Sequence, residues 1–466
     1  MRCAGFNLLF LLFFALSGIH NLSTCFPRNM SKTTRVNFQS GDSYLGNHTM
    51  GENKESTHRV TPIAEFVRKK DTSESLRLLL TSLERFYQPE SYDDEIETKE
   101  AVKLESDRCK RYGFVYNQSV THKRRRIFMG SLVADDTWHV IATHAAEAYG
   151  LYHTVVLIES NTTQTMTERE TRFDKGSLNW RMIHSGIFGA KTNIVIDFRP
   201  DAAKDFPGLP PIWRENLQRS YITRKWKDAG MKPNDIGIIC DVDEVFTRDF
   251  LLALQICDVP NFRTGQDCFR PQVSGQGLTF ETGPNCQFQR RRFFHRPNAI
   301  IGECIEHIGD ETIHTKGMRN TGNWPGSHLI ATRIFDRDPN RTFYPLWQPW
   351  DFRNSKSDEN LVLENGKRHT GYHFHNFFNS FDDFRNKYKT YGHPNDSVDK
   401  APIESFGTGH MIVPCLRGQK GMHESFDEIE GRRPLLWDAP YCVARSTEIQ
   451  EEFRRDAKQW EGSINS

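Results

Sequence analysis

The chain has 466 residues, of which 61 are basic and 60 acidic, so its formal net charge is +1. This balance gives no support for bulk binding of nucleic acid, which uses a strongly basic surface. The length allows one large domain or two ordinary ones, and the 33 phenylalanines, 13 tyrosines and 9 tryptophans supply apolar surface for a sizeable core.

The N-terminus carries an apolar segment, residues 4–19, that no charged residue interrupts. The segment is shorter than the ~20 residues of an ordinary membrane-spanning helix. It therefore predicts either a cleaved signal peptide or a short signal-anchor within residues 1–22. Both interpretations place the rest of the chain in the secretory lumen or outside the cell. A buried N-terminal helix of a cytosolic protein is the alternative.

Glycosylation sequons and cysteines agree with a luminal location. Seven Asn-x-Ser/Thr sequons are present, beginning at Asn21, Asn29, Asn47, Asn117, Asn161, Asn340 and Asn395. Eight of the ten cysteines lie beyond residue 25, and in an oxidising compartment several of them are expected to form disulfides. Cys240 lies inside an apolar run and is a candidate for a free, buried thiol.

A polar stem is expected before the folded body. Residues 23–60 are rich in Ser, Thr, Asn and Gly, a composition typical of a flexible segment. Between residues 61 and 111, leucines recur at helical spacing and predict one or two amphipathic helices. We place the stem at residues 23–125, the catalytic body at residues 126–445 and a polar C-terminal helix or tail at residues 446–466.

The body alternates predicted strands and helices. Strands are expected at 127–133, 154–159, 193–197 and 237–240, with helices at 138–149, 213–227 and 248–255. Such alternation predicts an α/β fold with a mostly parallel sheet. From about residue 260 to 350 the pattern loosens into Gly, Pro, Arg and aromatic residues, which indicates a more antiparallel or loop-rich half.

The strand expected at 237–240 ends in two carboxylates, Asp241 and Asp243, followed by Glu244. In open α/β sheets, ligands bind at the carboxyl ends of the strands. Two carboxylates there can hold a hard divalent cation, which in turn can hold a diphosphate. An isolated Asp-x-Asp is also common as a turn cap, so the residues alone leave both interpretations open.

Other polar side chains are candidates for the same site. Glu159 ends its predicted strand at the same sheet edge and could contact a nucleotide or cap a turn. His373 and His375 alternate, so they share one face of an extended segment, and His373 is the favoured cation or diphosphate ligand. An acidic cluster could supply a general base or form a solvated loop, and it consists of Glu303, Glu306, Asp310 and Glu311.

Four segments together resemble glycosyltransferase family 17, the family of β-1,4-mannosyl-glycoprotein 4-β-N-acetylglucosaminyltransferases that add bisecting GlcNAc. They are the strand with E-S-N-T-T at 155–163, the W-R-E-N helix at 213–216 with Arg219, the Asp-x-Asp segment at 233–245, and G-Y-H-F-H-N-F-F at 371–378. Tyr372 and Phe374 replace the Trp and Cys of the family pattern. These replacements leave the acceptor and the linkage open.

The resemblance implies a GT-A-like nucleotide-diphosphosugar transferase fold. It further implies inverting transfer of N-acetylglucosamine from UDP-GlcNAc to a glycan acceptor such as the β-mannose of N-glycans. The implied location is the Golgi membrane, with a single N-terminal anchor and a luminal catalytic domain, or secretion. Two other classes remain open, a secreted carbohydrate-binding protein without catalysis and a secreted metal-dependent hydrolase.

Site roles follow from the same resemblance. Asp241, Asp243 and His373 are expected to hold Mn²⁺ or Mg²⁺. The donor nucleotide sugar is expected to contact these three residues and also Glu159 and Arg214. Asp243, Glu244 and Glu159 are the expected catalytic residues.

Overall fold

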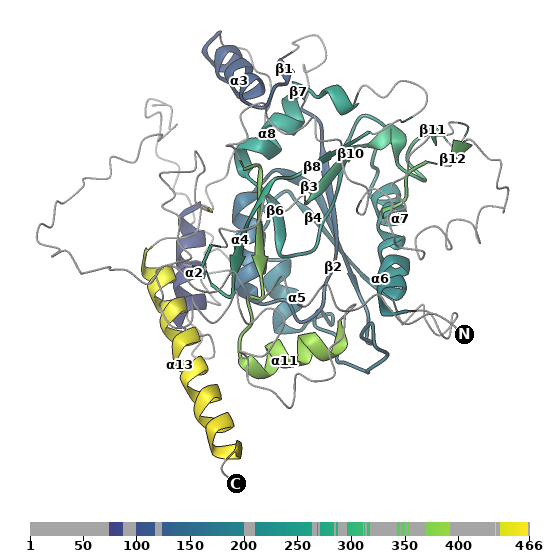
Figure 1. Ribbon diagram of the computed structural model, residues 1–466. Coiled ribbons are helices and arrows are strands. Elements are labelled where there is room, and N and C mark those ends of the chain that lie inside the picture. Colours follow the sequence, from purple (N-terminus) through teal and green to yellow (C-terminus); the bar gives the residue numbers. More distant parts are fainter. Residues whose placement is uncertain are drawn as a thin grey trace, which may run out of the picture. The chain divides into compact units, whose positions relative to one another are not determined.

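The computed structural model describes sixteen stretches of the chain (Figure 1). They are residues 74–86, 99–116, 124–199, 210–262, 268, 271–283, 286–287, 296–310, 312, 315–316, 343–344, 346–349, 353, 369–391, 434 and 439–464. The expected signal or anchor at residues 1–22 and the polar stem up to residue 60 lie outside this part. No helix within the described part is long and apolar enough to cross a membrane.

A six-stranded mixed sheet forms the centre of the fold. Its order is β4 (Asn193–Phe198), β3 (Tyr152–Glu159), β2 (Ile127–Leu132), β5 (Ile236–Ile239), β10 (Asn298–Ile301) and β8 (Gln272–Ser274). The first four strands run parallel to their neighbours, while β10 is antiparallel to both β5 and β8. The prediction of a parallel half followed by a more antiparallel half is confirmed for the described residues.

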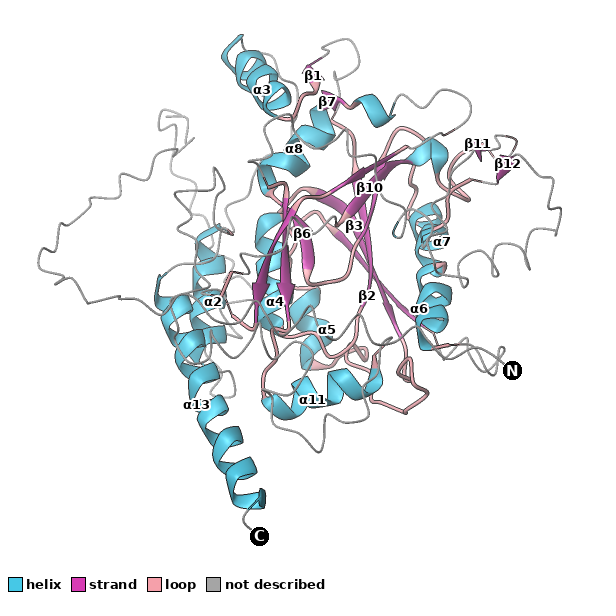
Figure 2. Cartoon of the chain, in the orientation of Figure 1, coloured by secondary structure: helices cyan, strands magenta, loops and turns pink. Residues whose placement is uncertain are grey.

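Smaller sheets flank the central one (Figure 2). In a three-stranded sheet, β13 (Gly371–His375) lies between β6 (Glu244–Phe246) and β9 (Gly277–Glu281). β13 is antiparallel to β6 and parallel to β9. Two pairs complete the strands of the described residues, β1 (Val115–Tyr116) with β7 (Cys257–Asp258) and β11 (Thr315–Lys316) with β12 (Phe343–Tyr344).

Helices lie on both sides of the central sheet. α4 (Trp138–Glu147) and α5 (Leu178–Ile183) follow β2 and β3, while α6 (Pro211–Arg219) and α7 (Tyr221–Asp228) precede β5 on the opposite side (Figure 1). This placement is the one that right-handed crossovers require when the chain reverses direction across the sheet. The single helix predicted at 213–227 is therefore two helices, divided at Ser220.

α7 packs directly onto the sheet because two glycines leave room for it. A Cβ atom at Gly130 of β2 would lie 2.1 Å from Ile222, and one at Gly237 of β5 would lie 2.5 Å from Trp226. The buried Trp226 indole N–H also donates a hydrogen bond of 3.2 Å to the Met129 carbonyl. Glycine at these two positions therefore sets how closely helix and sheet approach.

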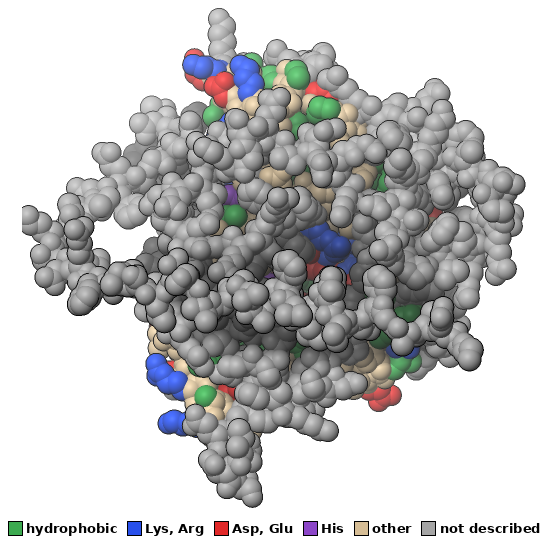
Figure 3. All heavy atoms as spheres, in the orientation of Figure 1, with side chains coloured by type: hydrophobic (Ala, Val, Ile, Leu, Met, Phe, Trp, Pro, Cys, Tyr) green, Lys and Arg blue, Asp and Glu red, His purple; other side chains and the backbone are tan. Residues whose placement is uncertain are grey.

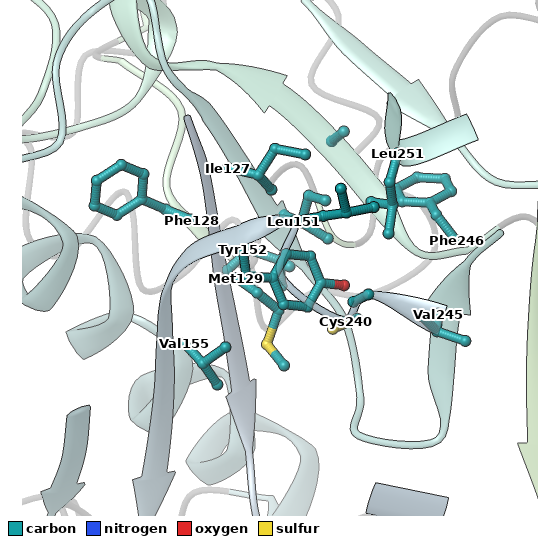
Figure 4. Packing of buried hydrophobic residues seen from close by; sticks show 14 of the residues in the cluster. Ile127, Phe128, Met129, Leu151, Tyr152, Val155, Cys240, Val245, Phe246 and Leu251 are labelled. Carbon is teal, nitrogen blue, oxygen red and sulfur yellow. The ribbon is translucent and has the colours of Figure 1, made fainter. Parts of the chain in front are cut away.

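The main core lies between these layers (Figure 4). Its labelled members include Phe128 and Met129 of β2, Val155 of β3, and Phe246 of β6, all of them buried. Each apolar side chain removed from water contributes roughly 1.5–3 kcal/mol. β2, β3 and β5 are apolar runs without alternation because helices or strands cover both of their faces.

Helices and disulfides also join segments that are distant in the sequence. α2 (Glu74–Phe86) packs against α4 and against α13 (Ala439–Ile464), and α3 (Lys99–Arg111) packs against α8 (Arg248–Ile256). The remaining helices of the described part are α11 (Phe381–Thr390), η2 (Pro260–Phe262) and η3 (Gly302–Cys304). α2 and α3 confirm the helices predicted between residues 61 and 111.

Two disulfides are described in full. Cys109 of α3 is bonded to Cys257, and Cys268 is bonded to Cys304. Cys240 is the one free cysteine within the described residues, and it is buried. The prediction of a buried thiol at this position is confirmed.

Candidate active site

The site lies where the connections of the sheet change direction. From β2 the chain steps outward through β3 to β4, then returns to place β5 on the other side of β2. The carboxyl ends of β2 and β5 therefore flank a topological switch point, the usual ligand position in open α/β sheets. Asp241 and Asp243 follow β5 at this edge. Figure 3 shows acidic and basic side chains next to each other near the middle of one face.

Hydrogen bonds fix the turn from Asp241 to Glu244. The Glu244 N–H donates to the Asp241 carbonyl at 3.0 Å, and the Asp241 N–H donates to the Glu244 carboxylate at 3.0 Å. Between them, the Val242 carbonyl lies 2.9 Å from Nδ1 of His144, a buried residue of α4. The Glu244 side chain and His144 of α4 thus fix the conformation of the turn without a ligand.

Two arginines pair with Asp241. Arg219 donates to its Oδ1 at 2.5 Å, and Arg353 donates to its Oδ2. Arg353, only 1% exposed, also forms a bidentate pair with the Glu244 carboxylate. Burial disfavours the charged form of Asp241, but the two guanidinium groups outweigh it and hold the pKa of this carboxyl well below its usual range. Asp241 is 41% exposed, so it still faces the site.

Asp243 and His373 form the other half of the site. β13 pairs with β6 so that His373 lies opposite Glu244, and the Phe374 N–H donates to the Asp243 carbonyl at 2.7 Å. His373 Nε2 lies 3.6 Å from Asp243 Oδ2. Burial opposes charge on both groups, yet their mutual attraction lowers the pKa of Asp243 and raises the pKa of His373.

The donor set suits a divalent cation. One ligand atom from each of Asp243, Glu244 and His373 lies within 4.8 Å of the other two. The Glu244 carboxylate accepts hydrogen bonds from Arg353 and from the Asp241 N–H, whereas Asp243 Oδ2 and His373 Nε2 lie 3.6 Å from each other. Magnesium-like ions commonly take one or two protein ligands and complete their shell with phosphate oxygens and water, so these residues fit Mn²⁺ or Mg²⁺.

The structure places Glu159 and Arg214 in other contacts. The buried Glu159 carboxylate accepts hydrogen bonds from the backbone N–H groups of Arg172 and Phe173, the latter at 3.1 Å. Arg214 donates to the Gln164 carbonyl at 2.6 Å. Both side chains thus hold the segment that follows β3. Asp241, Asp243, Glu244 and His373 are the expected site residues that the fold brings together.

The acidic cluster considered as a source of the general base lies at the wrong end of the sheet. Asn298 pairs with Ile239 and Ile301 with Ile236, so β10 leads away from Asp241. The Glu303 N–H accordingly donates to the Pro233 carbonyl, on the amino-terminal side of β5. Because β10 is antiparallel to β5, Glu303, Glu306 and Asp310 follow it at the end of the sheet away from Asp241. Glu311 lies outside the described residues.

Residues 86–263 match the model of glycosyltransferase family 17. By this match the chain is a glycosyltransferase. No curated protein matches the chain in a sequence search. The match covers β2, β3, β4, β5 and the Asp-x-Asp turn, whereas His373 lies beyond it.

Proposed function

We propose that this glycosyltransferase moves N-acetylglucosamine from UDP-GlcNAc to a glycan acceptor such as the β-mannose of N-glycans, with inversion, on a GT-A-like fold. The observation that carries the proposal is the Asp243–His373 pair, whose Oδ2 and Nε2 atoms lie 3.6 Å apart. Asp243 follows β5, which the family 17 match covers, and His373 comes from β13, which the match does not cover. A nucleotide sugar needs a site that accepts a diphosphate, and this edge of the sheet is suited to one.

Asp243 and His373 would hold Mn²⁺ or Mg²⁺. When bound, the cation supplies Lewis-acid stabilisation of the negative charge that develops on the leaving diphosphate. Asp241 keeps a different role, because Arg219 and Arg353 already pair with its two oxygens. Its exposed part faces the donor and can accept hydrogen bonds from ribose hydroxyl groups.

The remaining residues of the turn orient these groups. Glu244 is buried and joins Arg353 to the backbone of Asp241, so it keeps the turn in one shape. In the transfer step, an acceptor hydroxyl oxygen forms a bond to the anomeric carbon while the bond from that carbon to the diphosphate oxygen breaks. The hydroxyl proton passes to a base, and attack opposite the leaving group inverts the configuration.

We place the reaction in the Golgi lumen, with residues 1–22 as a single membrane anchor, or alternatively in a secreted form. The sequons and the Cys109–Cys257 and Cys268–Cys304 disulfides support an oxidising, secretory location.

The test uses the full chain, purified from a secretory expression host, with a panel of UDP- and GDP-sugars and N-glycan acceptors, with and without Mn²⁺. We expect Mn²⁺-dependent release of UDP from UDP-GlcNAc, together with the mass gain of one N-acetylhexosamine on the acceptor. Transfer from another donor alone would overturn the assignment of N-acetylglucosamine. Absence of turnover with every donor, in protein shown to be folded, would contradict the proposal as a whole.

A further inference from the structure

A second imidazole–carboxylate pair lies beside the candidate site. β13 and β9 run parallel with His375 directly opposite Glu281. His375 Nδ1 lies 2.7 Å from Glu281 Oε1. The Glu281 side chain is 1% exposed, whereas that of His375 is 25% exposed. A buried carboxylate thus holds one end of an imidazole ring that is itself partly open to solvent.

The pair is held from a third side by Asn376. Its side-chain amide donates to Glu281 Oε2 at 3.3 Å and lies 3.2 Å from the Tyr388 hydroxyl of α11. Asn376 has a φ of +56°, a left-handed conformation that Asn tolerates better than most residues. The chain therefore turns sharply just after His375, and both oxygens of Glu281 have partners.

This arrangement sets the orientation of the ring. An ionised carboxylate is only an acceptor, so Nδ1 of His375 is the nitrogen that carries hydrogen toward Glu281. Nε2 is the ring nitrogen that Glu281 does not contact, and it can form a hydrogen bond with a hydroxyl group. A buried carboxylate that fixes the tautomer of a histidine is an arrangement by which enzymes present a ring nitrogen to a hydroxyl group.

The ring also lies next to the cation ligands. His373 and His375 lie on the same face of β13, with ring centroids 5.0 Å apart, and His373 contacts Asp243. An acceptor hydroxyl group that is hydrogen-bonded to His375 would therefore lie near the anomeric carbon of a donor whose diphosphate binds beside Asp243 and His373. A hydroxyl group can donate or accept a hydrogen bond, so it suits Nε2 of His375 whether or not that nitrogen carries hydrogen.

We propose that His375 binds and orients the acceptor hydroxyl, and that Glu281 is the positioning residue that fixes the ring. The inference rests on the proposed function, because it assigns the acceptor side of the same transfer site. It separates the site into a donor half, containing Asp241, Asp243 and His373, and an acceptor half formed by His375 and Glu281.

The test compares His375→Asn and Glu281→Gln in the full chain. We measure kcat and KM for the glycan acceptor, KM for UDP-GlcNAc, and the release of UDP without acceptor. Loss of one substrate hydrogen bond should lower kcat/KM for the acceptor by about 10- to 100-fold. UDP release without acceptor and the KM for UDP-GlcNAc should stay within about twofold of the unaltered chain, since the donor half is intact.

Glu281→Gln tests the positioning role separately. The Gln amide can donate to Nδ1 and so reverse the tautomer, which should lower acceptor use while the ring remains present. His184→Asn is the matched control, because His184 is an exposed histidine directly after α5 that stacks on Trp180. It should leave every kinetic constant unchanged.

The outcomes are distinguishable. A rise in KM for UDP-GlcNAc, or slower UDP release without acceptor, would show that His375 belongs to the donor half and would overturn the inference. So would unchanged acceptor kinetics in His375→Asn. Glu281 is buried, so Glu281→Gln can lower the melting temperature. In that case the kinetics of His375→Asn, at a more exposed position, test the inference. Failure of the unaltered chain to transfer any sugar would instead refute the proposed function.

Discussion

At the scale of single residues, the surroundings of each carboxylate in the Asp-x-Asp-Glu turn give it a different role. Asp241 is paired with two arginines, Glu244 is buried against Arg353, and Asp243 faces His373. The three acidic side chains are chemically alike. Their partners, which come from elsewhere in the chain, distinguish them, and for this reason we propose Asp243 as the cation ligand.

Arg353 provides the sharpest test at this scale. Arg353→Met removes the guanidinium from a buried position and leaves Asp241 and Glu244 without their shared partner. Breaking a buried ion pair in this way costs about 3–5 kcal/mol, so the free energy of unfolding should fall by that amount in urea denaturation.

The matched control for Arg353→Met is Arg455→Met. Arg455 of α13 pairs with Glu452 at an exposed position, where an ion pair is worth about 0–1 kcal/mol. Equal, small losses in both variants would mean that Arg353 does not hold the turn together.

The sequence predicts part of this site and not the rest. Asp241, Asp243 and Glu244 are close together in the chain and follow an apolar run, so their position at a strand end can be predicted from the sequence. Arg353 lies more than a hundred residues away with no local pattern to mark it, and Glu281 becomes significant only through its register with His375. Such long-range pairings depend on sheet topology, which hydrophobic periodicity does not encode.

At the scale of elements, α4 supports the Asp-x-Asp turn through His144. This side chain is fully buried, with Nδ1 at the Val242 carbonyl and Nε2 3.1 Å from the Tyr152 hydroxyl. Burial lowers the pKa of His144 from 6.5 to about 4, despite the opposing effect of the Val242 carbonyl. The ring is therefore neutral in the folded protein near neutral pH.

This pKa predicts a loss of stability in acid. Between pH 6.5 and about 4, the unfolded chain binds a proton at His144 while the folded chain does not, so the free energy of unfolding falls as the pH falls. The group should account for about 3 kcal/mol over that window. In His144→Gln, denaturation at several pH values should show a correspondingly weaker dependence, whereas His184→Gln should keep the original slope. Identical slopes in all three proteins would contradict the prediction.

The contact between α7 and the sheet gives a second prediction for elements. Gly130→Ala places a methyl group 2.1 Å from Ile222, so α7 must shift away from β2. Overpacking of this kind costs about 1–3 kcal/mol, which thermal or urea denaturation would detect. A stability equal to that of the unaltered chain would show that helix and sheet are less closely fitted than the structure indicates.

Elements were more predictable than the site. The four parallel strands and most helices of the body lie where hydrophobic patterning places them, because strands covered on both faces read as apolar runs. Two features could not be predicted from the sequence. The division of α6 from α7 at Ser220 carries no Pro or Gly signal. The antiparallel pairing of β10 with β5, which carries the Glu303 cluster away from Asp241, is likewise not marked in the sequence.

At the scale of the whole molecule, a disulfide ties the region before the central sheet to the region after α8. Cys109 and Cys257 are separated by 148 residues in the sequence. Replacing both by serine should lower the free energy of unfolding by about 2–5 kcal/mol, mainly through the greater freedom of the unfolded chain. Denaturation of the double variant against the unaltered chain measures this loss, and an unchanged stability would mean that α3 is not held to the body by this bond.

The central claim is that Asp243 and its partner His373 form the donor half of a sugar-transfer site. The most direct measurement compares UDP-GlcNAc transfer by the full chain, by Asp243→Asn and by Asp228→Asn, each shown to be folded by circular dichroism. Asp228 is an exposed residue of α7, so its variant should transfer normally. Asp243→Asn should lose at least about 100-fold in transfer, because it removes a cation ligand. Full transfer by a folded Asp243→Asn variant would contradict the account.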